Sequence, residues 1–158
     1  MVIPLKNHAS EVGKPDASLR YIAAWNAAGV SAADARAAVR TLLARVGLDP
    51  HHRSSQDAQL VVSELVTNAA RHAPGPAALE FELTPDGDLL RISVRDSSPR
   101  LPQPRERDGG RIGGHGLYLI SQLCDQLHTI ALDAGKKIVA HLHLKSPPRA
   151  AVACLRQN

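Results

Sequence analysis

The stretch that decides the fold is Val62-Ser63-Glu64-Leu65-Val66-Thr67-Asn68-Ala69-Ala70-Arg71-His72. Its apolar residues recur at the three- and four-residue spacing of a helix that buries one side. Glu64 and Asn68 lie four residues apart, so both project from one face, and Arg71 and His72 continue that face a turn later. We therefore predict a helix with one side in a core and a polar face exposed to a ligand or to solvent.

The polar face of this helix has two alternative interpretations. A carboxylate and an amide oxygen stacked on one face, here Glu64 and Asn68, suit a magnesium ion, which takes one or two protein oxygens together with phosphates and waters. The Glu64 carboxylate also suits a general base that polarises a hydroxyl or a water. Taken alone, however, the pattern is more typical of a solvated helix face with ordinary side-chain pairing.

Periodicity on both sides of this helix predicts the other elements. They are strands at 19–25, 79–83, 90–94, 128–132 and 138–144, helices at 31–46, 54–72 and 117–127, and a long loop at 97–114. Ser31 and Ser54 each precede an aspartate by three residues, which is typical of a helix start. This order predicts an α+β fold, a two-layer sandwich with helices on one face of a mixed, mainly antiparallel sheet.

Length and composition limit the domain organisation. The chain has 158 residues, which suits a single core. We expect an arm at 1–30 with a candidate first strand, one domain at 31–145 and a tail at 146–158. The first residues lack a signal-peptide core, and no apolar run reaches membrane-spanning length, so we expect a cytoplasmic protein that does not bind membranes.

Charge and cysteine spacing argue against other functions. Aromatic residues make up only 3% of the chain, too few for a platform that stacks single-stranded nucleic acid. The net charge of +4 is spread among acids, and Arg36, Arg40 and Arg45 are expected to form a solvated edge of the first helix. A DNA-binding regulator is therefore the least favoured function. Cys124 and Cys154 lack the paired spacing of a metal site.

Two further signals lie at the ends of predicted elements. Asp96 ends a strand directly before Ser97-Ser98-Pro99, where a carboxylate can accept a hydrogen bond from a ligand amino group, although turn-forming aspartates have the same pattern. Gly113-Gly114-His115-Gly116 precedes a helix, whose free N–H groups and dipole attract phosphate. A glycine cluster in that position is more often only a loop.

The order of the three signals resembles the GHKL (Bergerat-fold) ATPase and kinase superfamily. Residues 62–72 resemble its N-box, Asp96-Ser97-Ser98-Pro99 its adenine-binding motif, and Gly114-His115-Gly116-Leu117 its second glycine motif. The short length and the closing Gly-Lys-Lys-Ile-Val strand at 135–139 are similar to the stand-alone anti-sigma regulatory factors of actinobacteria, which are serine/threonine kinases.

This resemblance implies ATP and Mg²⁺ as ligands and a role for each matching residue. Glu64 would be the general base, Asn68 the magnesium ligand and Asp96 the adenine-binding carboxylate with Ser98 beside it, while Arg71, His72, Gly114, His115, Gly116 and Leu117 would lie near phosphate. Two residues depart from the superfamily pattern. Ser98 replaces the first glycine of the Asp-x-Gly motif, and Lys137 stands near a threonine that helps the aspartate bind adenine.

The resemblance also implies a function. It favours a serine/threonine protein kinase of the anti-sigma-factor type, which transfers the γ-phosphoryl group of ATP to an anti-sigma-factor antagonist of the STAS type, with a sigma factor as a further partner and a homodimer as its assembly. The alternative is a non-catalytic module that sequesters a partner with or without nucleotide. His141 and His143 alternate on the last strand, where a solvent-facing strand is more expected than a metal site.

Overall fold

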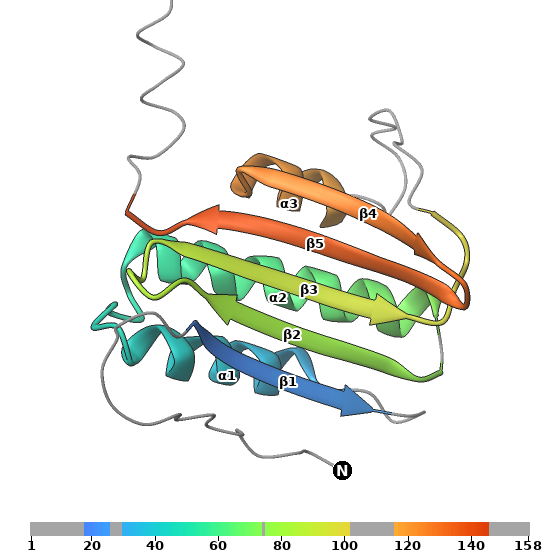
Figure 1. The fold of residues 1–158 in the computed structure, drawn as a ribbon, viewed down its shortest axis with the longest axis horizontal. Helices are drawn as coiled ribbons and strands as arrows, with labels where there is room; N and C mark the ends of the chain where they lie inside the picture. Colours follow the sequence, from blue (N-terminus) through green and yellow to red (C-terminus); the bar gives the residue numbers. More distant parts are fainter. Residues whose placement is uncertain (1–17, 26–29, 74, 102–115, 146–158) are drawn as a thin grey trace, which may run out of the picture.

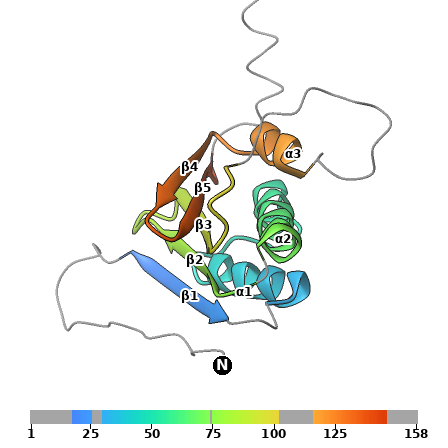
Figure 2. The same ribbon diagram turned by 90° about the vertical axis from the view of Figure 1, so that its right-hand side faces the viewer.

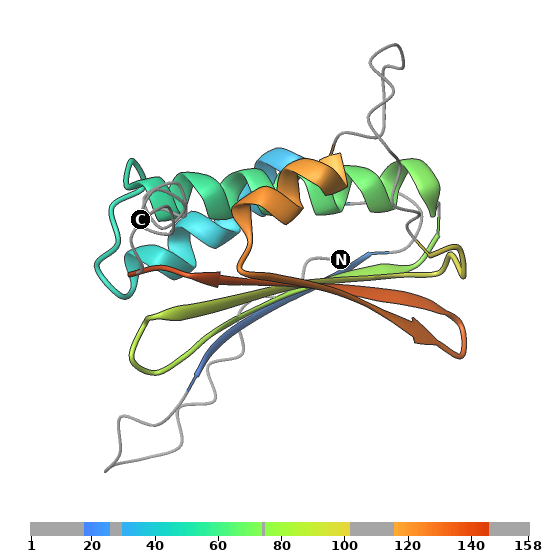
Figure 3. The same ribbon diagram turned by 90° about the horizontal axis from the view of Figure 1, so that it is seen from above.

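The computed structural model describes residues 18–25, 30–73, 75–101 and 116–145. The strands are β1 (Leu19–Trp25), β2 (Ala77–Leu83), β3 (Leu89–Asp96), β4 (Gln126–Leu132) and β5 (Gly135–His143), and the helices are α1 (Ala32–Ala44), α2 (Arg53–His72) and α3 (Gly116–Leu123) (Figure 1). Seen edge-on, the three helices lie on one face of the sheet (Figures 2 and 3). The predicted α+β sandwich is therefore confirmed.

The sheet brings distant segments together. Its strand order is β1-β2-β3-β5-β4, so β5 lies between β3 and β4, and all four pairings are antiparallel. The β3–β5 register runs from the pair Leu89 and His143 to the pair Asp96 and Lys136. The end of β3 consequently meets the start of β5, although Asp96 and Lys136 are 40 residues apart in the chain.

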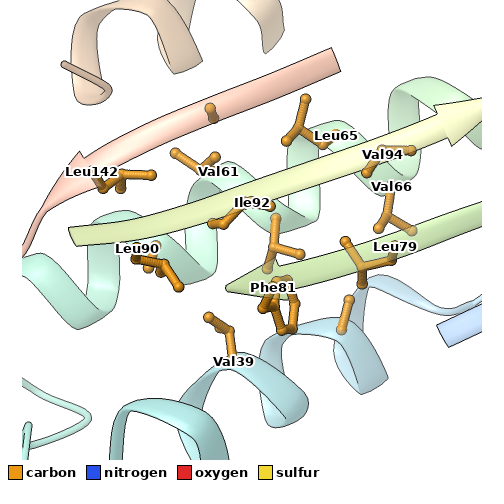
Figure 4. Packing of buried hydrophobic residues seen from close by; sticks show 14 of the residues in the cluster. Val39, Val61, Leu65, Val66, Leu79, Phe81, Leu90, Ile92, Val94 and Leu142 are labelled. Atoms are coloured by element: carbon orange, nitrogen blue, oxygen red, sulfur yellow. The ribbon is translucent and has the colours of Figure 1, made fainter. Parts of the chain in front are cut away.

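The core lies between the inner face of the sheet and the apolar sides of α1 and α2 (Figure 4). Alternate residues of the strands supply its sheet side, and residues at helical spacing supply the other: Leu79, Phe81, Leu83, Leu90, Ile92, Val94, Ile138, Ala140 and Leu142 face Val39, Leu43, Val61, Val62, Leu65, Val66 and Ala69. Phe81 is fully buried and stacks on Tyr21 of β1 with ring centroids 5.2 Å apart.

The N-terminal ends of α1 and α2 have different capping residues. Ser31 caps α1 as predicted, because its hydroxyl accepts a hydrogen bond from the Asp34 N–H at 3.0 Å. For α2 the cap is His52 rather than Ser54: His52 Nδ1 accepts from the Ser54 N–H at 3.2 Å. The Ser54 hydroxyl instead donates to the Leu144 carbonyl at 2.8 Å, which ties the start of α2 to the end of the sheet.

Two sequence predictions about the helices are wrong. Helix α3 ends at Leu123, and Leu127, predicted as its last apolar residue, instead pairs with Ala140 in β4. Apolar residues near an element boundary fit either period, so spacing alone does not separate a short helix from the following strand. Arg36 is half-buried rather than solvated, because its guanidinium donates to Ser63 Oγ of α2 at 3.0 Å.

We expect Phe81→Ala to lower the free energy of unfolding by about 3–5 kcal/mol, because it leaves a cavity in a fully buried site. Ile22→Ala on β1 is the matched control. Its side chain is 53% exposed, so the change should cost much less. Urea unfolding followed by circular dichroism measures both, and equal losses for the two variants would contradict the assigned core.

Candidate functional site

Helix α2 holds Glu64 and Asn68 on the side that is turned away from the deepest core. Both are half-buried, whereas Leu65, Val66 and Ala69 are almost completely buried. Glu64 lies against the first residue of α3: a Cβ atom added to Gly116 would come within 2.5 Å of Glu64 Oε2. The carboxylate therefore lies at the start of α3, and a side chain at position 116 would require the end of the Glu64 side chain to move.

A second polar cluster lies where β3 ends. Asp96 and Lys136 form an ion pair, with Lys136 Nζ 2.9 Å from Asp96 Oδ1. The same Oδ1 accepts a hydrogen bond from the Ser98 N–H at 2.9 Å, and Lys136 Nζ also lies 3.3 Å from the Ser98 carbonyl oxygen. These contacts fix the orientation of the Asp96 carboxylate and of the backbone that follows it.

Two glycines allow the backbone to approach this cluster closely. Gly135, with φ of +105°, begins β5, and a Cβ there would lie 1.9 Å from the Asp96 carbonyl oxygen. Gly75, just beyond α2, has φ of +149°, and a Cβ there would lie 2.9 Å from Ser97 Oγ. The second contact shows that the chain just after α2 lies beside the chain just after β3.

The structure corrects the prediction made for Lys137. Its ammonium lies 3.4 Å from Glu80 Oε2 of β2, and Glu80 alternates with the core residues Leu79 and Phe81, so Lys137 lies on the outer face of the sheet. The residue beneath Asp96 is Lys136, which sequence reasoning missed. Strand alternation was the available signal, because Lys136 lies two residues before the core residue Ile138 and must share its face.

The other predicted site residues are only partly brought together. Ser98 and Leu117 are half-buried, the first in the Asp96 cluster and the second packed against the core beside Gly116. Arg71 and His72 are exposed in the last turn of α2, where cations favour the negative end of the helix dipole. Gly114 and His115 lie outside the described residues.

The sequence matches a family model over residues 25–141, and that model is described as the histidine kinase-like ATPase domain. This chain belongs to that family. ATP binding follows from membership, and the matched residues include Glu64, Asn68, Asp96 and Gly116. A search of curated proteins returned no significant match.

One solved structure supports the fold of this histidine kinase-like ATPase domain. It contains the RsbU and RsbW domains of a Mycobacterium tuberculosis protein and matches 81% of the present chain with 23% identity and a TM-score of 0.59. The present chain spans about a third of that chain, 33% of its length. At this identity the likeness shows a shared fold, which agrees with the two-layer arrangement in Figure 3.

This ATPase domain also contains a cavity that lies apart from the predicted site. The cavity, of about 170 Å³, is lined by Tyr21, Ala38, Thr41, Leu42 and Arg45, none of which is a predicted site residue. Among the described residues, no three His, Cys, Asp or Glu side chains are grouped so that they could hold a metal ion. Within the described ranges, no helix is long and apolar enough to cross a membrane.

The two histidines of β5 have different surroundings. His143 Nδ1 lies 3.2 Å from Asp125 Oδ2, and the His143 N–H donates to the same oxygen at 2.7 Å. Burial lowers the pKa of His141, and the positive charges of His128 and Arg91 lower it further. Its Nδ1 is buried without a hydrogen-bond partner among the described residues, which agrees with a neutral ring.

The two close glycines should respond differently to substitution. We expect Gly135→Ala to destabilise the protein by at least about 1–3 kcal/mol, because the new Cβ meets a backbone oxygen and the φ angle disfavours alanine. Gly116→Ala should cost less stability, because the end of the Glu64 side chain can move aside. Thermal unfolding compares the two variants, and a larger loss for Gly116→Ala would contradict this geometry.

Proposed function

We propose that this protein is a regulatory kinase that transfers the γ-phosphoryl group of ATP to a serine or threonine hydroxyl of a protein partner. The observation that carries the proposal is the contact between Glu64 and the start of α3, with Asn68 one turn further along α2. The Glu64 carboxylate thus lies beside the N-terminus of a helix, which attracts phosphate, and Asn68 follows it on the same face of α2. By resemblance, the partner is an anti-sigma-factor antagonist in the cytoplasm.

The residues present fit ATP and magnesium. Asn68 and Glu64 supply the hard oxygen atoms that Mg²⁺ prefers, and a magnesium ion bound with a nucleotide needs only one or two protein ligands because phosphates and waters complete its shell. Bound there, the ion would neutralise charge on the phosphates. At the other end, the Asp96 carboxylate is an acceptor suited to the amino group of adenine.

In the proposed transfer, the protein itself forms no covalent bond to the phosphoryl group. The acceptor hydroxyl oxygen forms a bond to the γ-phosphorus while the bond from that phosphorus to the bridging oxygen of ADP breaks. The hydroxyl proton passes to the Glu64 carboxylate, and ADP leaves. Catalysis of this kind rests mainly on positioning and on stabilising charge, which is why the fixed spacing between Glu64 and α3 supports the proposal.

We expect Asn68→Ala to remove magnesium-dependent nucleotide binding, because the amide oxygen is the proposed ligand of the ion. Titration calorimetry with ATP, with and without Mg²⁺, measures this effect. Gln56→Ala, at an exposed position near the start of the same helix, is the matched control and should bind like the unmodified protein. Unchanged binding by Asn68→Ala would refute the assignment.

We expect Glu64→Gln to slow phosphoryl transfer by about 10²- to 10⁴-fold while ATP still binds, because the amide cannot accept the hydroxyl proton. The assay incubates the protein with γ-labelled ATP, Mg²⁺ and a candidate STAS-type antagonist, and follows label on the antagonist. Equal rates for Glu64→Gln and the unmodified protein would eliminate Glu64 as the base.

The same assay tests the alternative function. Nucleotide binding without label on any candidate antagonist, together with formation of a stable complex with a sigma factor or an antagonist, would favour a non-catalytic sequestering module. The observation that favours this alternative is the departure at Ser98, which stands where the superfamily motif has its first glycine.

A further inference from the structure

Lys136 is a buried cation in an otherwise apolar setting. Its side chain is only 4% exposed and that of Asp96 is 2% exposed. Among the described residues it is the only buried lysine or arginine. Taking two such charges out of water costs several kcal/mol per ion, and apolar residues of similar volume often serve stability equally well. Stability is therefore a weak reason for a lysine here, and a binding role is a better one.

The hydrogen bonds of the pair leave one donor and one acceptor side by side. An ammonium group has three N–H bonds. Two of them are directed to Asp96 Oδ1 and the Ser98 carbonyl oxygen, and within the described ranges the third has no partner. Asp96 Oδ1 accepts from both Lys136 and Ser98, while a carboxylate has about four acceptor positions in total.

This arrangement complements one edge of adenine. The 6-amino group of adenine is a donor, and the neighbouring ring nitrogen N1 is an acceptor, so the edge presents a donor beside an acceptor. Asp96 and Lys136 present the reverse order. We propose that Lys136 donates its third hydrogen bond to N1 of the base while Asp96 accepts from the 6-amino group. Lys136 is then a residue that determines nucleotide specificity, an inference that rests on the proposed ATP site.

A charged donor changes how the base is selected. A neutral hydroxyl at this position would need a water to reach the ring, whereas the ammonium can make a charge-assisted hydrogen bond directly. Hydrogen bonds to charged groups are worth about 1.5–3 kcal/mol, which corresponds to roughly 10- to 100-fold in affinity. Loss of the N1 acceptor should therefore be measurable as a change in the dissociation constant.

The test compares ATP with two analogues that each lack one ring nitrogen. Titration calorimetry of the unmodified protein with Mg²⁺ should give roughly 10- to 100-fold weaker binding for 1-deaza-ATP than for ATP. Binding of 7-deaza-ATP should match that of ATP. Because these titrations use the unmodified protein, their results do not depend on whether a variant folds. Equal affinity for ATP and 1-deaza-ATP, or a loss confined to 7-deaza-ATP, overturns the proposal.

Two variants assign the effect to one side chain. Lys136→Met should bind ATP more weakly and should no longer distinguish ATP from 1-deaza-ATP, whereas Lys137→Met, altered on the outer face, should keep the full discrimination. Discrimination that persists in a folded Lys136→Met protein contradicts the assignment. Absence of any ATP binding to the unmodified protein overturns the nucleotide site as well. Discrimination without phosphoryl transfer would leave this inference standing and refute only the kinase.

Discussion

The packing of α2 on the inner face of the sheet is the interaction on which the site depends. Val61, Leu65 and Val66 are almost completely buried against the strands, and this fixes the rotation of the helix about its own axis. Once the rotation is fixed, the direction in which each remaining side chain leaves the helix is fixed as well. Glu64 is thereby turned toward α3, close enough that a side chain at Gly116 would collide with it. The same core therefore supplies both stability and the geometry of the polar face.

The pairing of β3 with β5 has the corresponding role at the other end of the site. It places Asp96 opposite Lys136 at one end of two interior strands, on the inner face of the sheet, where neither charge would be tolerated alone. Their mutual pairing, the Ser98 N–H and the close approach of Gly135 together hold the carboxylate in one orientation. An acceptor that is fixed in this way loses little conformational entropy when a ligand binds. A buried ion pair that adds little to stability can thus still favour binding.

Local spacing in the sequence was enough to predict most of the fold, and the roles given to the site residues stay predictions. The periods of α1, α2 and the paired strands are strong because each element has one buried face, and Glu64, Asn68 and Asp96 follow from those elements directly. What spacing could not predict was the order of the strands, because no short-range pattern records that β5 lies between β3 and β4. The cap at His52 was missed because a serine followed by an aspartate three residues later is the commoner signal. Lys136 was missed because the motif comparison selected Lys137, although strand alternation alone places Lys136 on the face of Ile138.

The chain beyond α2 and the chain beyond β3 also lie close to each other. Gly75, beyond the end of α2, approaches Ser97, which directly follows Asp96. In the proposed site, the base end would depend on a charged pair, whereas the phosphate end would depend on the spacing between two helices. Because these interactions differ in kind, base recognition and the proposed phosphoryl transfer could change separately, and a protein without transfer activity would still have a physical basis for recognising adenine.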